Sequence, residues 1–210
     1  IGTLLYSIKA TADNFSNAGG VLQNFKLTSV SDAIIVTVPF HDPMCATGLV
    51  QLLHNIQYEL IATNFKSLIR GYISRGPVYH KNGLLFGAGY CDAYAGEKDF
   101  GGAPRIVISP DIIEDAKRVV SSYSGREKMV SLFDFIREDS SDGFYFVDYL
   151  KPVGVPALLT KEELIKERNS IKTFIVSCLD KYKRNYSIWQ KYKWLENYFK
   201  DSSQYFGEGS

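Results

Sequence analysis

The pattern of apolar and polar residues predicts a hairpin in the middle of the chain. A strand from Leu68 to Tyr79 is indicated by three β-branched residues, Ile69, Ile73 and Val78. Asn82-Gly83 is a strong signal for a two-residue turn, and the apolar residues 84–86 return as the partner strand. The two strands and their turn therefore form one predicted unit.

A short helix is predicted directly after this hairpin, from about Tyr90 to Lys98. Gly87 and Gly89 lead into it. Glycines between a strand and a helix N-terminus leave room for a phosphate group, which the exposed amides attract. Because glycines at such turns are more often structural, this pattern alone is weak evidence for phosphate binding.

The first forty residues predict a helix and then two strands. Residues 1–18 have apolar residues on one helical face, namely Leu4, Leu5, Ile8 and Ala12. Alternation in residues 22–32 and a β-branched block in residues 33–39 predict strands that are joined tightly at Ser31-Asp32. Aspartate at a hairpin is usually a turn former, but a carboxylate between two core strands is also well placed to hold a hard cation. The pattern leaves both interpretations of Asp32 open.

The middle of the chain alternates between helices and strands. Residues 44–64 have the apolar spacing of a core helix. A buried strand is predicted at residues 106–109, a helix at residues 111–120 and another strand at residues 143–150. Residues 121–142 are polar and charged, which predicts a surface excursion between the last helix and strand.

Two helices are predicted at the C-terminal end. Thr160 and Glu163 form a capping box that begins a helix running to about Tyr182. The second helix, residues 186–199, carries an aromatic stripe that is typical of a core or a subunit interface. We therefore expect a main domain at residues 1–155, with residues 156–210 as helices packed on the same domain.

Composition excludes several classes of protein. Apolar residues make up 45% of the 210 residues, which is enough for a sizeable core. A formal net charge of +1 gives no overall field that would attract nucleic acid or a membrane surface. The three cysteines, Cys45, Cys91 and Cys178, lack metal-ligand spacing and fit a reduced, cytoplasmic protein.

The three histidines are not assigned a catalytic role. His41 and His80 are isolated in sequence from cysteine and carboxylate partners. His54 lies within the predicted core helix, where a position on the helix surface is expected rather than a role as a metal ligand.

Five segments together resemble the class III nucleotidyl cyclase catalytic domain. They are SDAIIV at residues 31–36, RGYISRGPVYHKNGLLFGAGYCDAYAGEK at 70–98, PRIVI at 104–108, FVDYL at 146–150 and KYKWLENY at 191–198. The set is more closely similar to the pyrimidine cyclases of bacterial Pycsar anti-phage defence. Each motif is short, so the specificity of the resemblance comes from the whole set and its order.

The resemblance implies an α+β fold and a reaction. The fold would be a central, mostly antiparallel sheet flanked by helices, with the C-terminal helices as an appendage. The reaction would convert UTP to 3′,5′-cyclic UMP and pyrophosphate. CTP is the alternative substrate, and a purine nucleotide is the third choice. It also implies a homodimer with interfacial active sites, and a separate effector that the cyclic nucleotide activates.

In this family two carboxylates bind two divalent ions, Mn²⁺ or Mg²⁺. One ion lowers the pKa of the ribose 3′-hydroxyl, and the other neutralises the triphosphate. Asp32 matches one carboxylate, at the hairpin. The other is expected just upstream of Ile1, since Ile1-Gly2 match the end of an Asp-x-x-Gly pattern.

Three further comparisons with the family suggest site residues. Where purine cyclases carry an asparagine and an arginine, this chain has Cys91 and Ala95, so the stabilising charge must come from elsewhere. Arg75 is named as the catalytic residue, with Arg70 and Arg105 as the other candidates for that charge, and the lysine that reads a purine base aligns with Thr28. The predicted substrate-binding residues are Thr28, Ser31, Arg70, Tyr90 and Arg105.

Two functions from other classes compete with the cyclase. A catalytically inactive cyclase-like module would bind a nucleotide without turnover. A purely structural dimerisation domain would use the aromatic C-terminal helices. Metal-dependent nucleotide binding is expected of the inactive module but not of the structural dimerisation domain, so it distinguishes the two.

Overall fold

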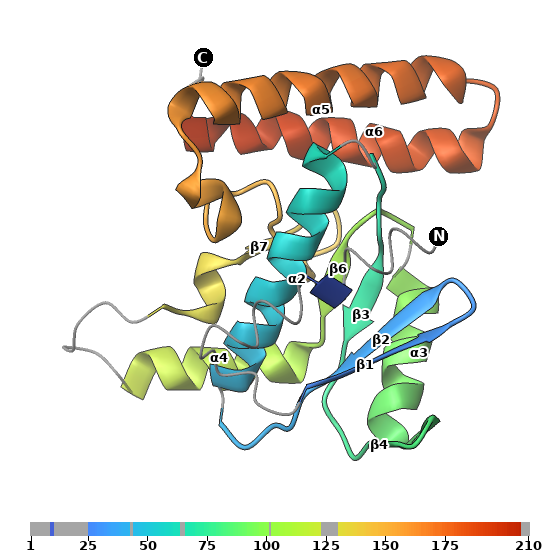
Figure 1. Ribbon diagram of the computed structural model, residues 1–210, viewed down its shortest axis with the longest axis vertical. Helices are drawn as coiled ribbons and strands as arrows, with labels where there is room; N and C mark the ends of the chain where they lie inside the picture. Colours follow the sequence, from blue (N-terminus) through green and yellow to red (C-terminus); the bar gives the residue numbers. More distant parts are fainter. Residues whose placement is uncertain are drawn as a thin grey trace.

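The computed structural model describes residues 9–10, 25–42, 44–63, 66–100, 102–122 and 130–206. It shows an α+β protein in which helices surround three small sheets (Figure 1). Except for residues 9–10, the helix predicted for residues 1–18 lies outside the described residues.

A four-stranded sheet forms the centre. Its strands are β3 (Gly71–Ile73), β6 (Ile106–Ile108), β8 (Tyr145–Val147) and β7 (Ile136–Glu138), in that order. The β3–β6 pair is parallel, and the other two pairs are antiparallel.

Helix α2 (Met44–Ala62) covers one face of this sheet. Leu52 and Ile56 from the helix share a core with Ile73, Ile108 and Val147 from the strands. The predicted core helix is therefore confirmed.

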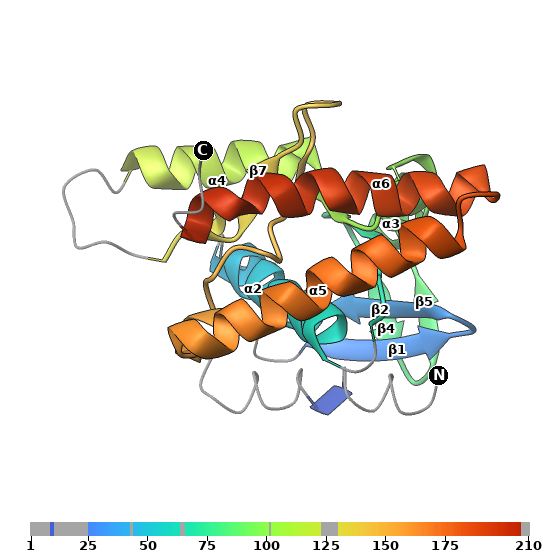
Figure 2. The same cartoon turned by 90° about the horizontal axis from the view of Figure 1, so that it is seen from above.

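The opposite face is covered by the C-terminal helices α5 (Lys161–Lys181) and α6 (Tyr186–Asp201). Phe146 points away from its neighbour Val147, and its ring centroid lies 5.4 Å from that of Trp194 and 5.2 Å from that of Tyr198. Figure 2 shows α5 and α6 side by side, with α5 crossing α2. Leu195 and Tyr198 from the aromatic stripe of α6 are thus buried in a core that they share with Phe146 of the sheet.

Helix α3 (Ala88–Phe100) packs against β3 through Gly96 and Tyr72. A Cβ atom at position 96 would lie 2.4 Å from Cγ of the Tyr72 ring, so only glycine fits there. Tyr72 also stacks on Phe100, with the ring centroids 5.6 Å apart.

Two hairpins lie outside the central sheet. β1 (Lys26–Val30) pairs with β2 (Ala33–Thr37), and β4 (Tyr79–Lys81) pairs with β5 (Leu84–Phe86). Both predicted turns are confirmed. In the second, Asn82 and Gly83 have φ values of 55° and 75°, as a two-residue turn of this type requires.

The caps of three helices follow their sequence signals. Thr160 and Glu163 form the predicted capping box of α5, and the Asn185 side chain caps α6. Helix α4 (Pro110–Ser122) begins with proline in its first turn, and the Ser109 carbonyl accepts bonds from residues 112 and 113.

Three expectations were wrong. Residues 130–142 are not a surface excursion, because Leu132, Phe135 and Ile136 are buried and β7 lies here, preceded by the short 3₁₀ helix Leu132–Asp134. The strand predicted for residues 68–79 contains only the three residues of β3 before β4 begins. His54 is fully buried rather than on the helix surface, and its Nε2 lies 3.1 Å from the Lys151 carbonyl oxygen.

The remaining short elements are 3₁₀ helices at Val155–Leu158 and Ser202–Phe206. Among the helices of the described residues, none is both long and apolar enough to span a bilayer.

Candidate functional site

Asp32 lies at the tip of the β1–β2 hairpin. Val30 and Ala33 are the last paired residues, so Ser31 and Asp32 alone form the turn. Ser31 has a φ of 57°, and both turn residues are exposed. In the described part of the chain, no cationic side chain forms an ion pair with Asp32, so its carboxylate is available to a ligand from solution.

Thr28 lies on β1, four residues before Asp32, and its hydroxyl is bonded to a histidine. Thr28 Oγ1 is 2.6 Å from His80 Nε2, and Thr37 Oγ1 is 2.7 Å from His80 Nδ1. The Lys26 ammonium donates to the His80 carbonyl oxygen. His80 therefore joins the two hairpins, and the sequence did not reveal this because its partners are more than forty residues away.

Burial and the charge of Lys26 lower the pKa of His80 below its ordinary value of 6.5. The ring is therefore neutral at neutral pH, with one nitrogen donating and the other accepting.

The glycines before α3 serve close backbone packing rather than an open phosphate cradle. A Cβ atom at Gly76 would lie 2.9 Å from the Gly89 nitrogen. The Gly89 amide donates to the Pro77 carbonyl oxygen at 3.2 Å, and the Ser74 hydroxyl donates to the Gly89 carbonyl oxygen at 2.6 Å. Of the amides that could bind phosphate, that of Gly89 is already used.

Arg70 contacts the C-terminal part of α3, whereas Tyr90 lies at the start of that helix. Arg70 directly precedes β3, and its Nε is 2.6 Å from Glu97 Oε1 on α3. Tyr90 is partly exposed in the first turn of α3. Arg70 remains half exposed, so it can contact a ligand without leaving Glu97.

Arg75 lies beyond the other end of β3. It forms ion pairs with Asp115 and, at 3.3 Å, with Asp111 at the start of α4, and its guanidinium lies 5.1 Å from the centroid of the Phe40 ring. Phe40 follows the C-terminal end of β2, whereas Asp32 precedes its N-terminal end. The five residues of β2, roughly 16 Å, therefore separate Phe40, and with it Arg75, from Asp32 within one protomer.

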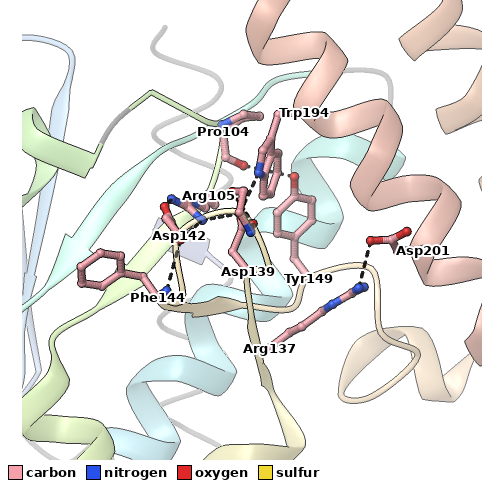
Figure 3. Close-up of polar contacts among 10 residues, drawn as sticks. Pro104, Arg105, Arg137, Asp139, Asp142, Phe144, Tyr149, Trp194 and Asp201 are labelled. Atoms are coloured by element: carbon pink, nitrogen blue, oxygen red, sulfur yellow. Dashed lines mark hydrogen bonds and ion pairs between the residues drawn. The ribbon is translucent and has the colours of Figure 1, made fainter.

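Arg105 is enclosed beneath α6 (Figure 3). Its guanidinium forms ion pairs with Asp139 and Asp142 in the β7–β8 connection, and it lies 5.7 Å from the centroid of the Trp194 ring. Trp194 Nε1 donates to Asp139 at 2.8 Å. With 5% of its side chain exposed, Arg105 is placed to hold the sheet and α6 together rather than to meet a substrate.

Asp139 stays ionised within this network. Burial alone would raise its pKa, but hydrogen bonds from Ser141 and Trp194 and the charge of Arg105 hold the pKa below the ordinary value. The ionised carboxylate of Asp139 thus faces the guanidinium of Arg105, and the network is a charged one.

The predicted site residues fall into four places. Thr28, Ser31 and Asp32 share the β1–β2 hairpin, and Arg70 and Tyr90 lie around α3. Arg75 and Arg105 are separate from both groups. Across the described ranges, no cluster of three or more histidine, cysteine or carboxylate residues could hold a metal ion.

Comparisons of this chain with protein-family models, with curated proteins and with solved structures find no match.

Proposed function

We propose that this chain is the catalytic domain of a pyrimidine nucleotide cyclase, which converts UTP to 3′,5′-cyclic UMP and pyrophosphate. The product would be a second messenger of anti-phage defence that activates a separate effector. The proposal rests on the resemblance of the five segments and on the position of Asp32. An exposed carboxylate at a tight hairpin tip is the observation that supports it best.

The described residues do not by themselves complete a site for two divalent ions. Asp32 supplies one carboxylate. In the described part of the chain it belongs to no group of three or more histidine, cysteine or carboxylate residues that could hold a metal ion. The proposal therefore requires the second carboxylate that the resemblance implies upstream of Ile1, and Mn²⁺ or Mg²⁺ would bind between the two. Asp32 would hold the ion, and the ion would supply the charge that neutralises the triphosphate.

The arrangement of strands is compatible with one more strand carrying that carboxylate. Ile34 and Val36 of β2 pack on the same core as Ile73 of β3, yet the two strands belong to different sheets. Among the described strands, β2 pairs only with β1, and β3 only with β6. Within the described residues, each of them thus has an unpaired edge to which a further strand could bond.

The distance between Asp32 and Arg75 bears on the proposed homodimer. If both act in one reaction, they must come from different protomers, because β2 separates them within a protomer. An active site shared between two subunits meets this condition, and each dimer would then contain two such sites.

Two alternatives remain. A cytidylate cyclase would use the same residues with CTP. An inactive nucleotide-binding module is favoured by the ion pairs of Arg75 and Arg105, since each guanidinium already faces two carboxylates. Binding of a nucleotide with Mn²⁺ but without product would distinguish that module from either cyclase.

The test is a product assay. The full-length protein is incubated with Mn²⁺ and, separately, with UTP, CTP, ATP and GTP, and the cyclic products are identified by mass. We expect cyclic UMP from UTP. A purine product would overturn the pyrimidine assignment, and no product from any of the four would favour the binding module.

A further inference from the structure

His80 is held at both ends of its ring. Nε2 lies 2.6 Å from Thr28 Oγ1 on β1, and Nδ1 lies 2.7 Å from Thr37 Oγ1 on β2. Rotating the ring by half a turn would place carbon atoms against both hydroxyls and lose both bonds. The Lys26 ammonium also holds the His80 carbonyl oxygen, and the residue is 8% exposed. The orientation of the imidazole is therefore fixed.

The register of the hairpin explains why one imidazole can reach both threonines. Lys26 is directly opposite Thr37, so Thr28 is the diagonal neighbour of Thr37 on the same face. Diagonal neighbours are about 7 Å apart, a span that an imidazole with a hydrogen bond at each nitrogen can bridge. Thr28 stays partly exposed, so its hydroxyl has room for a second partner.

A neutral histidine donates a hydrogen bond from one ring nitrogen and accepts one at the other, so its two partners have different roles. If Nε2 carries the proton, it donates to Thr28, and the Thr28 hydroxyl hydrogen is free to be donated to a ligand. If Nδ1 carries the proton, Thr28 must donate to Nε2, and only its lone pairs are left for a ligand. An unconstrained hydroxyl can do either, so it cannot distinguish a donor from an acceptor.

Resting on the proposed function, we infer that His80 is a positioning residue that fixes the hydrogen-bonding direction of the Thr28 hydroxyl and thereby selects the pyrimidine base. Uracil presents a carbonyl oxygen, an acceptor, at position 4. Cytosine presents an amino group, a donor, at the same position. With the proton on Nε2, Thr28 donates, which fits uracil and rejects cytosine.

The position of Thr28 relative to Asp32 suits this role. The two residues are four apart in one hairpin: two steps of extended strand, roughly 7 Å, lead from Thr28 to Val30, and the turn with Asp32 follows directly. An extended nucleotide covers a comparable length between its phosphates and the far edge of its base. Phosphates near Asp32 would therefore leave the base near Thr28.

The experiment compares UTP and CTP as substrates for matched variants. His80→Phe keeps the ring volume but removes both hydrogen bonds, and Thr28→Val removes the hydroxyl that is oriented. We expect the ratio of kcat/KM for UTP to that for CTP to fall at least about tenfold in both variants, the cost of one lost directional hydrogen bond. His41→Phe, in an exposed loop, and Thr173→Val, on the exposed side of α5, are the controls and should retain the wild-type ratio.

An unchanged ratio in a folded His80→Phe protein would overturn the inference. If that variant does not fold, the wild-type protein decides, because ¹⁵N NMR of the histidine ring reports which nitrogen carries the proton. A protein that prefers UTP must show the proton on Nε2, and a proton on Nδ1 would contradict the proposal.

The inference can fail separately from the cyclase proposal. If the wild-type protein makes no cyclic product, binding of UTP and CTP is measured by calorimetry in the presence of Ca²⁺. A preference for UTP that His80→Phe removes would support base selection in a protein that is not a cyclase. Equal binding of the two nucleotides by the wild-type protein would refute base selection itself.

Discussion

Two buried polar networks connect distant parts of this chain, and they differ in charge. The network of Arg105 is ionic and lies between the central sheet and α6 (Figure 3). The network of His80 is built from a neutral ring and two hydroxyls, with the Lys26 ammonium on the His80 carbonyl oxygen, and it lies between the two hairpins. The first is enclosed by aromatic rings, whereas the second keeps one hydroxyl partly exposed.

The difference assigns separate tasks to the two regions. The buried guanidinium of Arg105 is paired with two carboxylates, and Trp194 bonds one of them, so this network links the β7–β8 connection to α6. Neutral hydroxyls retain a donor or an acceptor after one bond is made. Under the proposed function, the hairpin with Asp32 and Thr28 binds the ligand, while the Arg105 network holds α6 to the central sheet.

The largest effect is expected from Arg105→Met. The substitution leaves the buried carboxylate of Asp139 without its cation, so we expect a loss of about 3–5 kcal/mol in the free energy of unfolding. Urea unfolding measures it. Arg118→Met, whose side chain is 77% exposed, is the matched control and should change stability by less than about 0.5 kcal/mol. A loss below about 1 kcal/mol for Arg105→Met would show that the network does not hold α6.

Arg75→Ala should separate turnover from stability. Its ion pairs are partly exposed, so unfolding should change by less than about 1 kcal/mol. If its charge stabilises the reaction, kcat should fall about 10²–10³-fold. An active Arg75→Ala protein would place that charge elsewhere.

Mixing subunits tests whether Arg75 acts across the proposed dimer. Arg75→Ala and Asp32→Asn proteins are each expected to be inactive, but mixed dimers would contain one intact site. Random mixing should restore roughly a quarter of wild-type activity, since half of the dimers are mixed. Failure to restore activity in dimers shown to be mixed would place Arg75 outside the shared site.

The smallest effect concerns pH. Burial is the main cause that lowers the pKa of His54 below 6.5, and it also lowers that of His80. Below pH 6.5 these histidines bind protons in the unfolded chain but less readily in the folded chain, so the free energy of unfolding falls as the pH falls. Each histidine contributes a slope of at most about 1.4 kcal/mol per pH unit. His54→Gln should reduce the slope measured between pH 6.5 and 5, whereas exposed His41→Gln should not.

Local signals predicted the local structure well. Ser31-Asp32 and Asn82-Gly83 gave both hairpins, and Thr160 with Glu163 gave the start of α5, because each signal depends on neighbouring residues. The strand β7 was missed because Phe135 and Ile136 lie within a long polar segment, and only packing against the core shows that they are buried.

The partners of buried polar residues could not be predicted. Arg105 pairs with residues more than thirty positions away, and nothing in its own neighbourhood indicates a buried guanidinium. His80 and His54 are likewise bonded to residues distant in sequence. The position of Asp32 at a tip could be read from the turn, but its separation from Arg75 required the structure.

The most direct test of the cyclase proposal is turnover of UTP by Asp32→Asn beside Asp180→Asn. Asp180 is 77% exposed at the far end of α5 and serves as the matched control. With Mn²⁺ and product detection by mass, we expect cyclic UMP from the wild-type and Asp180→Asn proteins and none from Asp32→Asn. Because Asp32 is an exposed turn residue, all three proteins should unfold at the same urea concentration. Undiminished cyclic UMP from Asp32→Asn would contradict the account.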